Sequence, residues 1–152
     1  MLVSLLNAID RFFQFLAAPL LLISRLLLAW FFFPAGLEKI QDYSGTASLM
    51  SSHGFPAILL PLVILLEMGG AVLLVAGLAT RLTCFALAVF TIVANQTYNS
   101  GDPNQVREFL YVAEFVTISG MAALMAVGPG AWSLDAFRRK SAAAVEPAAR
   151  DD

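Results

Sequence analysis

Four long apolar stretches constrain this chain more than any other feature of its sequence. They cover residues 20–37, 57–79, 82–98 and 109–127. Each is about as long as an α-helix must be to cross roughly 30 Å of hydrocarbon. Backbone polar groups cannot bond to water inside lipid, so these stretches are predicted to be helices rather than strands. The expected fold class is therefore all-α: a bundle of four transmembrane helices formed by residues 19–137.

Composition supports a membrane environment and excludes some classes of function. Hydrophobic residues make up 59% of the chain and charged residues 13%, against about 25% charged in soluble domains. A soluble domain of 152 residues could not hide this much apolar surface. No basic run is long enough to follow a phosphate backbone, so nucleic acid is not an expected partner. The single cysteine, Cys84, excludes an intrachain disulfide and is expected to be a core side chain.

The residues before and after the apolar stretches predict where the two ends lie. Residues 1–18 carry one polar stripe at helical spacing, which predicts an amphipathic interfacial helix, with Pro19 at a break or kink. Residues 138–152 are small and polar, and a disordered tail is expected there. The long segment from Glu38 to Pro56 is expected to be a loop. Its histidine, His53, has no partner ligands at metal spacing, so no metal site is predicted.

Basic residues predict the orientation. With a cytoplasmic N-terminus, the inner side holds Arg11, Arg81, Arg138, Arg139, Lys140 and Arg150, whereas the outer side holds only Lys39 and Arg107. This asymmetry follows the positive-inside rule. Both termini are therefore expected to be cytoplasmic, in a multi-pass protein of the cell membrane.

Four polar residues within the stretches are the candidate site: Arg25, Glu67, Asn95 and Glu114. A charge in lipid is costly, so such residues usually face the bundle interior. Arg25 and Glu67 each share a helical stripe with small residues, which also permit close packing. We therefore hypothesise that Arg25 and Glu67 form a buried ion pair, either directly or bridged by water. The alternative is that Arg25 extends to the interface while Glu67 stays protonated. Asn95 and Glu114 are expected at similar depth, where they could form a hydrogen bond.

The chemistry of these residues leaves three interpretations open. Buried carboxylates could relay protons, could bond to a quinone carbonyl or hydroxyl, or could only hold the helices together. No haem-ligand histidine pair, nucleotide fingerprint or nucleophile triad is present in the sequence. The sequence therefore does not decide whether the protein is an enzyme, and no covalently bound cofactor is expected.

Several short motifs resemble those of one family. Arg25 is followed by Gly36 and Lys39, an early arginine and a G-x-x-K helix end. The further matching positions are Met50, Gly54, Phe55, Pro56 and Glu67, the G-x-x-T-R turn at Gly77, Thr80 and Arg81, and Gly128, Pro129, Gly130, Ser133 and Asp135 near the end. In this order, over about residues 20–137, they resemble the DoxX family of small four-helix membrane proteins.

The resemblance implies a four-helix protein of the inner membrane. Family members have been linked to quinone-dependent oxidoreductases and to membrane-associated redox complexes. The expected function is thus an accessory or quinone-binding subunit of such a system, with an oxidoreductase as partner. A small transporter and a structural or assembly protein without catalysis are the alternatives. The sequence also leaves a homo-oligomer open.

Overall fold

The computed structural model describes residues 2–98 and 105–145, and every regular element in these ranges is helical. In chain order the elements are α1 (Leu2–Gln41), α2 (Tyr43–Ser52), the 3₁₀ turn η1 (Ala57–Leu59), α3 (Leu60–Ile64), the π-helical turn η2 (Leu65–Gly69), α4 (Gly70–Ala76), α5 (Thr80–Tyr98), α6 (Gln105–Val127) and α7 (Leu134–Val145). The all-α class predicted from the apolar stretches is confirmed for these residues.

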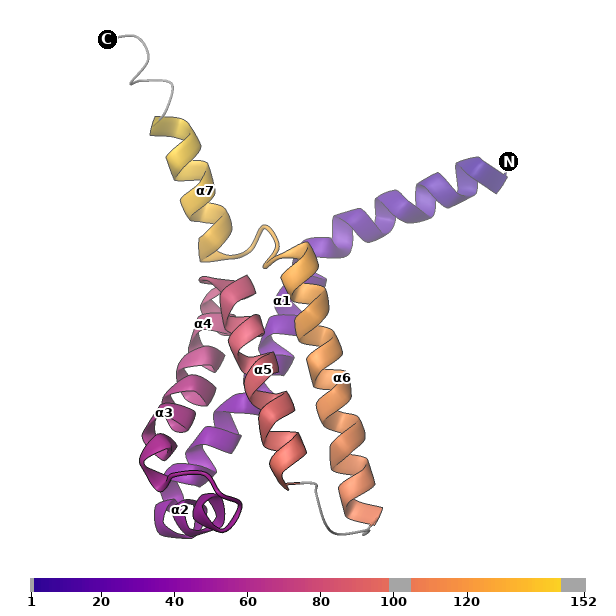
Figure 1. Cartoon of the computed structure of the whole chain (residues 1–152). Helices are drawn as coiled ribbons and strands as arrows, with labels where there is room; N and C mark the ends of the chain where they lie inside the picture. Colours follow the sequence, from indigo (N-terminus) through magenta and orange to yellow (C-terminus); the bar gives the residue numbers. More distant parts are fainter. Residues whose placement is uncertain (1, 99–104, 146–152) are drawn as a thin grey trace.

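Four helical segments pack side by side as a bundle (Figure 1). The second half of α1 packs on η2 and α4, α4 packs on α5, α5 on α6, and α6 returns to α1. The core between them contains side chains of all four segments, including Phe32, Leu74, Leu87 and Met121. Cys84 is fully buried in this core, as expected.

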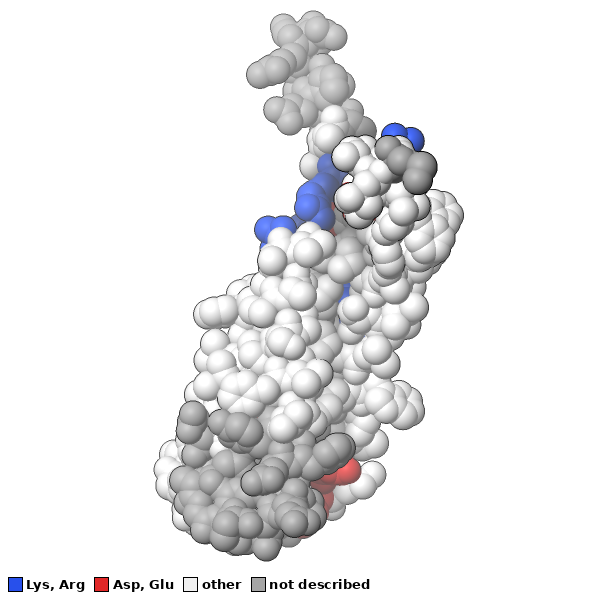
Figure 2. Space-filling view, turned by 90° about the vertical axis from the view of Figure 1, so that its right-hand side faces the viewer, with Lys and Arg blue, Asp and Glu red and all other residues white. Residues whose placement is uncertain are grey.

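The outer surface of the bundle is apolar. Large side chains such as Trp30, Leu62, Phe85 and Val116 are more than half exposed, an arrangement that suits lipid rather than water. By length and composition, α1 and residues 57–76 could each cross a membrane, and Thr80–Asn95 and Val112–Val127 are shorter apolar helices. In the space-filling view, charged side chains appear mainly near the two ends of the molecule (Figure 2).

The N-terminal part of α1 leaves the bundle at an angle (Figure 1). Residues 2–15 are exposed, and the first partly buried residue is Leu16. The helix continues through Pro19, whose missing N–H removes a helical hydrogen bond and permits a bend. The interfacial location of residues 1–18 stays a prediction.

Two segments expected to lack regular structure are helical. The predicted loop from Glu38 to Pro56 contains the end of α1 and all of α2. Asp42 caps α2, where its carboxylate accepts a hydrogen bond from Gly45 N at 3.0 Å. The predicted tail is helical as far as Val145, in α7. Its alanines and basic residues have high helix propensity, which outweighs their polar character. The remaining tail, 146–152, lies outside the described residues.

Candidate functional site

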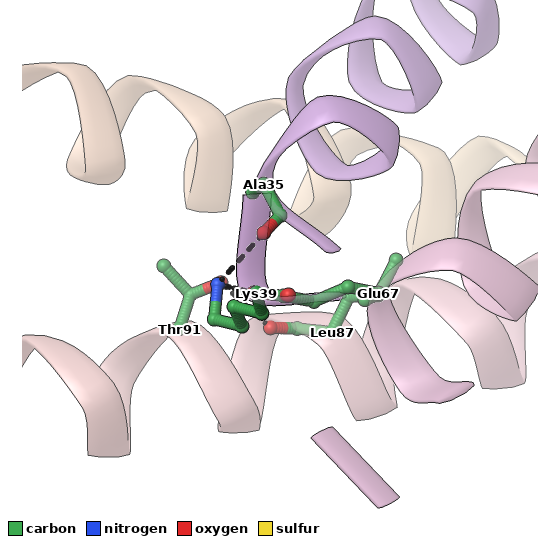
Figure 3. Close-up of polar contacts among 5 residues, drawn as sticks. All are labelled: Ala35, Lys39, Glu67, Leu87 and Thr91. Carbon is green, nitrogen blue, oxygen red and sulfur yellow. Dashed lines mark hydrogen bonds and ion pairs between the residues drawn. The ribbon is translucent and has the colours of Figure 1, made fainter. Parts of the chain in front are cut away.

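Lys39 and Glu67 form an ion pair between α1 and η2. Lys39 Nζ lies 2.9 Å from Glu67 Oε1 and also donates a hydrogen bond to Ala35 O at 3.2 Å. Figure 3 shows this pair beside Thr91 and Leu87 of α5. The Glu67 side chain is 4% exposed and that of Lys39 is 26% exposed. The pair therefore sits at the edge of the bundle interior, with the carboxylate on the buried side.

The sequence around Gly36 allows this pair to form. A Cβ atom at Gly36 would lie 2.5 Å from Met68 Cγ and 3.3 Å from Glu67 Cβ. Only glycine therefore lets α1 approach η2 so closely. Glu67 itself lies in a π-helical turn, a local widening of the helix that is frequent at functional sites. Three residues after Gly36, Lys39 continues the same face of α1 and meets the carboxylate.

The two carboxylate oxygens of Glu67 differ in their partners. Glu67 Oε2 is buried, and no hydrogen-bond donor reaches it in the described part of the chain. A buried polar atom without a partner is rare and costly, so it requires an explanation. A ligand or a proton at this oxygen would satisfy it.

A cavity of about 680 Å³ adjoins the pair. Its walls are mostly apolar and aromatic, with Phe31, Phe55 and Phe90 among the lining residues. Lys39, Glu67 and Glu114 line it as well, and Glu38, Asp42 and Thr46 add further polar groups. The cavity thus combines a long apolar wall with a few polar side chains, the usual composition of a small-molecule site.

Asn95 and Glu114 are brought together as expected. Asn95 Nδ2 donates a hydrogen bond to Glu114 Oε2, linking α5 to α6. Asn95 is buried and Glu114 is half-buried. Because Glu114 also lines the cavity, this bond connects the α5–α6 pair to the candidate site.

Arg25 lies elsewhere, and the hypothesised Arg25–Glu67 ion pair is wrong. Arg25 is fully buried, and the alternative that it extends to the interface stays a prediction. Its Nη1 donates hydrogen bonds to Leu74 O at 3.2 Å and to Val75 O at 3.3 Å. Its Nη2 donates to Trp132 O. Arg25 thus joins α1 to the end of α4 and to the segment before α7.

The position of Arg25 along α1 explains why it does not pair with Glu67. The close approach at Gly36 places Glu67 opposite the last turns of the bundled part of α1. Arg25 lies eleven residues earlier, about 16 Å along the helix axis at a rise of 1.5 Å per residue. That distance exceeds the reach of an arginine side chain. Extending the stripe of Arg25 and Gly36 by three more residues leads to Lys39, which lies two residues beyond the end of the apolar stretch 20–37.

The residues around Arg25 form a second polar cluster. Gly77 ends α4 with φ of 66°, a left-handed conformation that favours glycine. A Cβ there would lie 2.2 Å from Arg25 Nη1. Asp135 accepts hydrogen bonds from Ala79 N at 2.9 Å and Thr80 N at 3.1 Å, which caps the start of α5.

Comparison with known proteins identifies the family. The DoxX family model matches residues 20–99. The chain belongs to the DoxX family. It is 38% identical over 120 residues to the "Inner membrane protein YqjF" of Escherichia coli K12, covering 78% of this chain and 92% of that protein. It is 32% identical over 138 residues to the "Inner membrane protein YphA" of the same organism, covering 82% and 96%. No solved structure matches.

The DoxX assignment and these relatives make the chain an inner-membrane protein, as the sequence predicted. An uncharacterized protein of Haemophilus influenzae is 30% identical over 126 residues, covering 79% of this chain and 83% of that protein. Both polar clusters contain positions that carried the DoxX resemblance. Lys39 and Glu67 line the cavity and Gly36 packs beside Glu67. Arg25, Gly77, Thr80, Ser133 and Asp135 lie at the opposite end.

Proposed function

We propose that this DoxX protein binds a quinone in the cavity beside Lys39 and Glu67, as an accessory subunit of a membrane oxidoreductase system. The observation that carries the proposal is the buried Glu67 carboxylate. One oxygen is paired with Lys39 and the other has no partner among the described residues, at the wall of a mostly apolar cavity.

The lining fits the chemistry of a quinone. The ring and its apolar tail suit walls made of phenylalanine and aliphatic side chains. The two ring oxygens need hydrogen-bond donors in the oxidised form and acceptors in the reduced form. Lys39 Nζ supplies a donor, and Glu67 supplies an acceptor as a carboxylate or a donor as a carboxylic acid.

The Lys39–Glu67 pair also supports a role in proton movement. A bound quinone supplies two-electron redox chemistry that is coupled to protons. Glu67 can hold or release a proton at Oε2, while its Oε1 accepts the hydrogen bond from Lys39. The electrons would come from, or go to, a redox centre of a partner enzyme. Because the redox centre would belong to the partner enzyme, the proposed role of this protein is that of an accessory subunit.

We also propose that the bundle crosses the membrane four times, with both termini cytoplasmic. The N-terminal part of α1 and helix α7 leave the bundle at the same end (Figure 1). That end carries Arg81, Arg138, Arg139 and Lys140, consistent with the positive-inside rule. A reporter fused after Val145 and another inserted before Gln105 should report opposite sides of the membrane.

Quinone that co-purifies with the protein tests the function. Protein isolated from its native membrane should retain quinone close to one molecule per chain, measured by chromatography of the lipid extract. Lys39→Met should lose most of it, whereas Arg11→Gln, an exposed arginine on the same helix, should retain it. Proton-coupled solute uptake in liposomes without quinone retention would favour a transporter. Inertness in both assays with a stable protein partner would favour an assembly protein.

A further inference from the structure

We infer that a second site, separate from the quinone cavity, binds the phosphate headgroup of an anionic phospholipid. The site is a groove of about 590 Å³ between the start of α5 and helix α7. Three arginines line it: Arg81 from α5, and Arg138 and Arg139 from α7. We call it the basic groove.

Charge in the basic groove favours an anion. Asp135 is the one acidic side chain among its lining residues, and both of its carboxylate oxygens already accept hydrogen bonds from Ala79 N and Thr80 N. The arginines retain free donors. Among residues 2–98 and 105–145, Arg81 gives one hydrogen bond, from Nη2 to Ala126 O at 3.2 Å, and Arg139 gives one, from Nε to Asp135 O at 3.2 Å. Within the described residues, no hydrogen bond or ion pair engages Arg138.

The placement of the basic groove favours a lipid over a soluble anion. The groove lies where the apolar helices end, and Lys and Arg side chains gather at this end of the molecule (Figure 2). Its remaining wall is apolar and includes Leu82 and Ala142. Trp132 and Phe137 are exposed nearby in the sequence, and such aromatic residues are enriched at the membrane–water interface. A headgroup phosphate would meet the guanidinium groups while the acyl chains lie along the exposed side chain of Leu82.

Native mass spectrometry of the detergent-solubilised full chain tests this inference. The probe is phosphatidylglycerol, with phosphatidylcholine as the lipid without net charge. Wild-type protein should retain phosphatidylglycerol and little phosphatidylcholine. Arg81→Gln with Arg138→Gln should weaken phosphatidylglycerol binding by about tenfold or more, since each substitution removes one positive charge that attracts the anionic headgroup. The matched control, Arg11→Gln with Lys140→Gln, removes two charges outside the groove and should bind as wild type does.

A single substitution and a competition experiment test the lipid site further. Because Arg81 bonds to Ala126 O, Arg138→Gln alone is the variant least able to disturb folding, and it should still weaken binding severalfold. Equal retention of phosphatidylglycerol by the groove variants and the control would overturn the inference. Equal retention of phosphatidylcholine by wild-type protein would do so as well. Complete displacement of the lipid by millimolar inorganic phosphate would show that the groove recognises a soluble anion instead.

Discussion

The two buried charged clusters of this protein differ in what satisfies them. The two Nη atoms of Arg25 donate hydrogen bonds to main-chain carbonyls of Leu74, Val75 and Trp132, and its buried Nε has no partner among the described residues. In the part of the chain that the structure describes, the Glu67 carboxylate is held by one side chain, Lys39, and keeps an oxygen without a partner beside a cavity. A charge bound to backbone on several sides fixes helix positions. A charge with spare bonding capacity at a cavity is suited to a ligand.

The largest loss of stability is expected at the Arg25 cluster. Arg25→Met removes the charged donor to the carbonyl oxygens of Leu74, Val75 and Trp132, and charged hydrogen bonds are each worth about 1.5–3 kcal/mol. The variant should lose about 3 kcal/mol of stability or more, seen as a large fall in folded yield and in the thermal transition in detergent. Arg11→Gln is the control, because that arginine is exposed on the same helix. A variant as stable as this control would mean that the cluster does not hold the bundle together.

At the Lys39–Glu67 pair, ligand affinity should change more than stability. Lys39→Met and Glu67→Gln should each weaken quinone binding by about tenfold, or about 1.4 kcal/mol. The double variant should lose less than the sum, because each single change already breaks the pair. Binding is measured per folded molecule, by titration with a short-tailed quinone. If the two single losses simply add, the pair does not act as a unit at the ligand.

A smaller effect is expected from the cap on α5. Asp135→Ala removes the acceptor of Ala79 N and Thr80 N, and loss of a helix cap costs about 1 kcal/mol. The thermal transition should fall modestly while quinone affinity stays unchanged. A change in quinone affinity without a change in the thermal transition would mean that the Arg25 cluster also acts on the quinone site.

The smallest changes in stability and quinone affinity are expected from loss of the hydrogen bond between α5 and α6. Asn95→Leu removes its hydrogen bond to Glu114, and such bonds between membrane helices average about 0.6 kcal/mol. A small fall in the thermal transition is therefore expected. Because Glu114 lines the cavity, quinone affinity should also fall slightly, by about twofold. No effect on either measurement would place this bond outside the site.

The sequence predicted the helices and the inward-facing charges better than it predicted their partners. Length and hydropathy were sufficient to locate the apolar helices, and the cost of a charge in lipid was sufficient to place Arg25 and Glu67 inside. The Asn95–Glu114 contact was predicted because both residues were expected at similar depth on the third and fourth helices. The partner of Glu67 was missed because it depends on helix register, which the close approach at Gly36 sets. Hydropathy carries no information about that register.

Photoaffinity labelling tests the central proposal most directly. A photoreactive quinone added to the full chain in native-like membranes is activated by light, and the labelled residues are mapped by mass spectrometry. We predict labels on residues that line the cavity, such as Phe31, Met50 and Phe90. These labels should disappear with excess unlabelled quinone and in Lys39→Met. Labels spread over the lipid-facing surface, unchanged by competitor or by the substitution, would contradict a quinone site at Lys39 and Glu67.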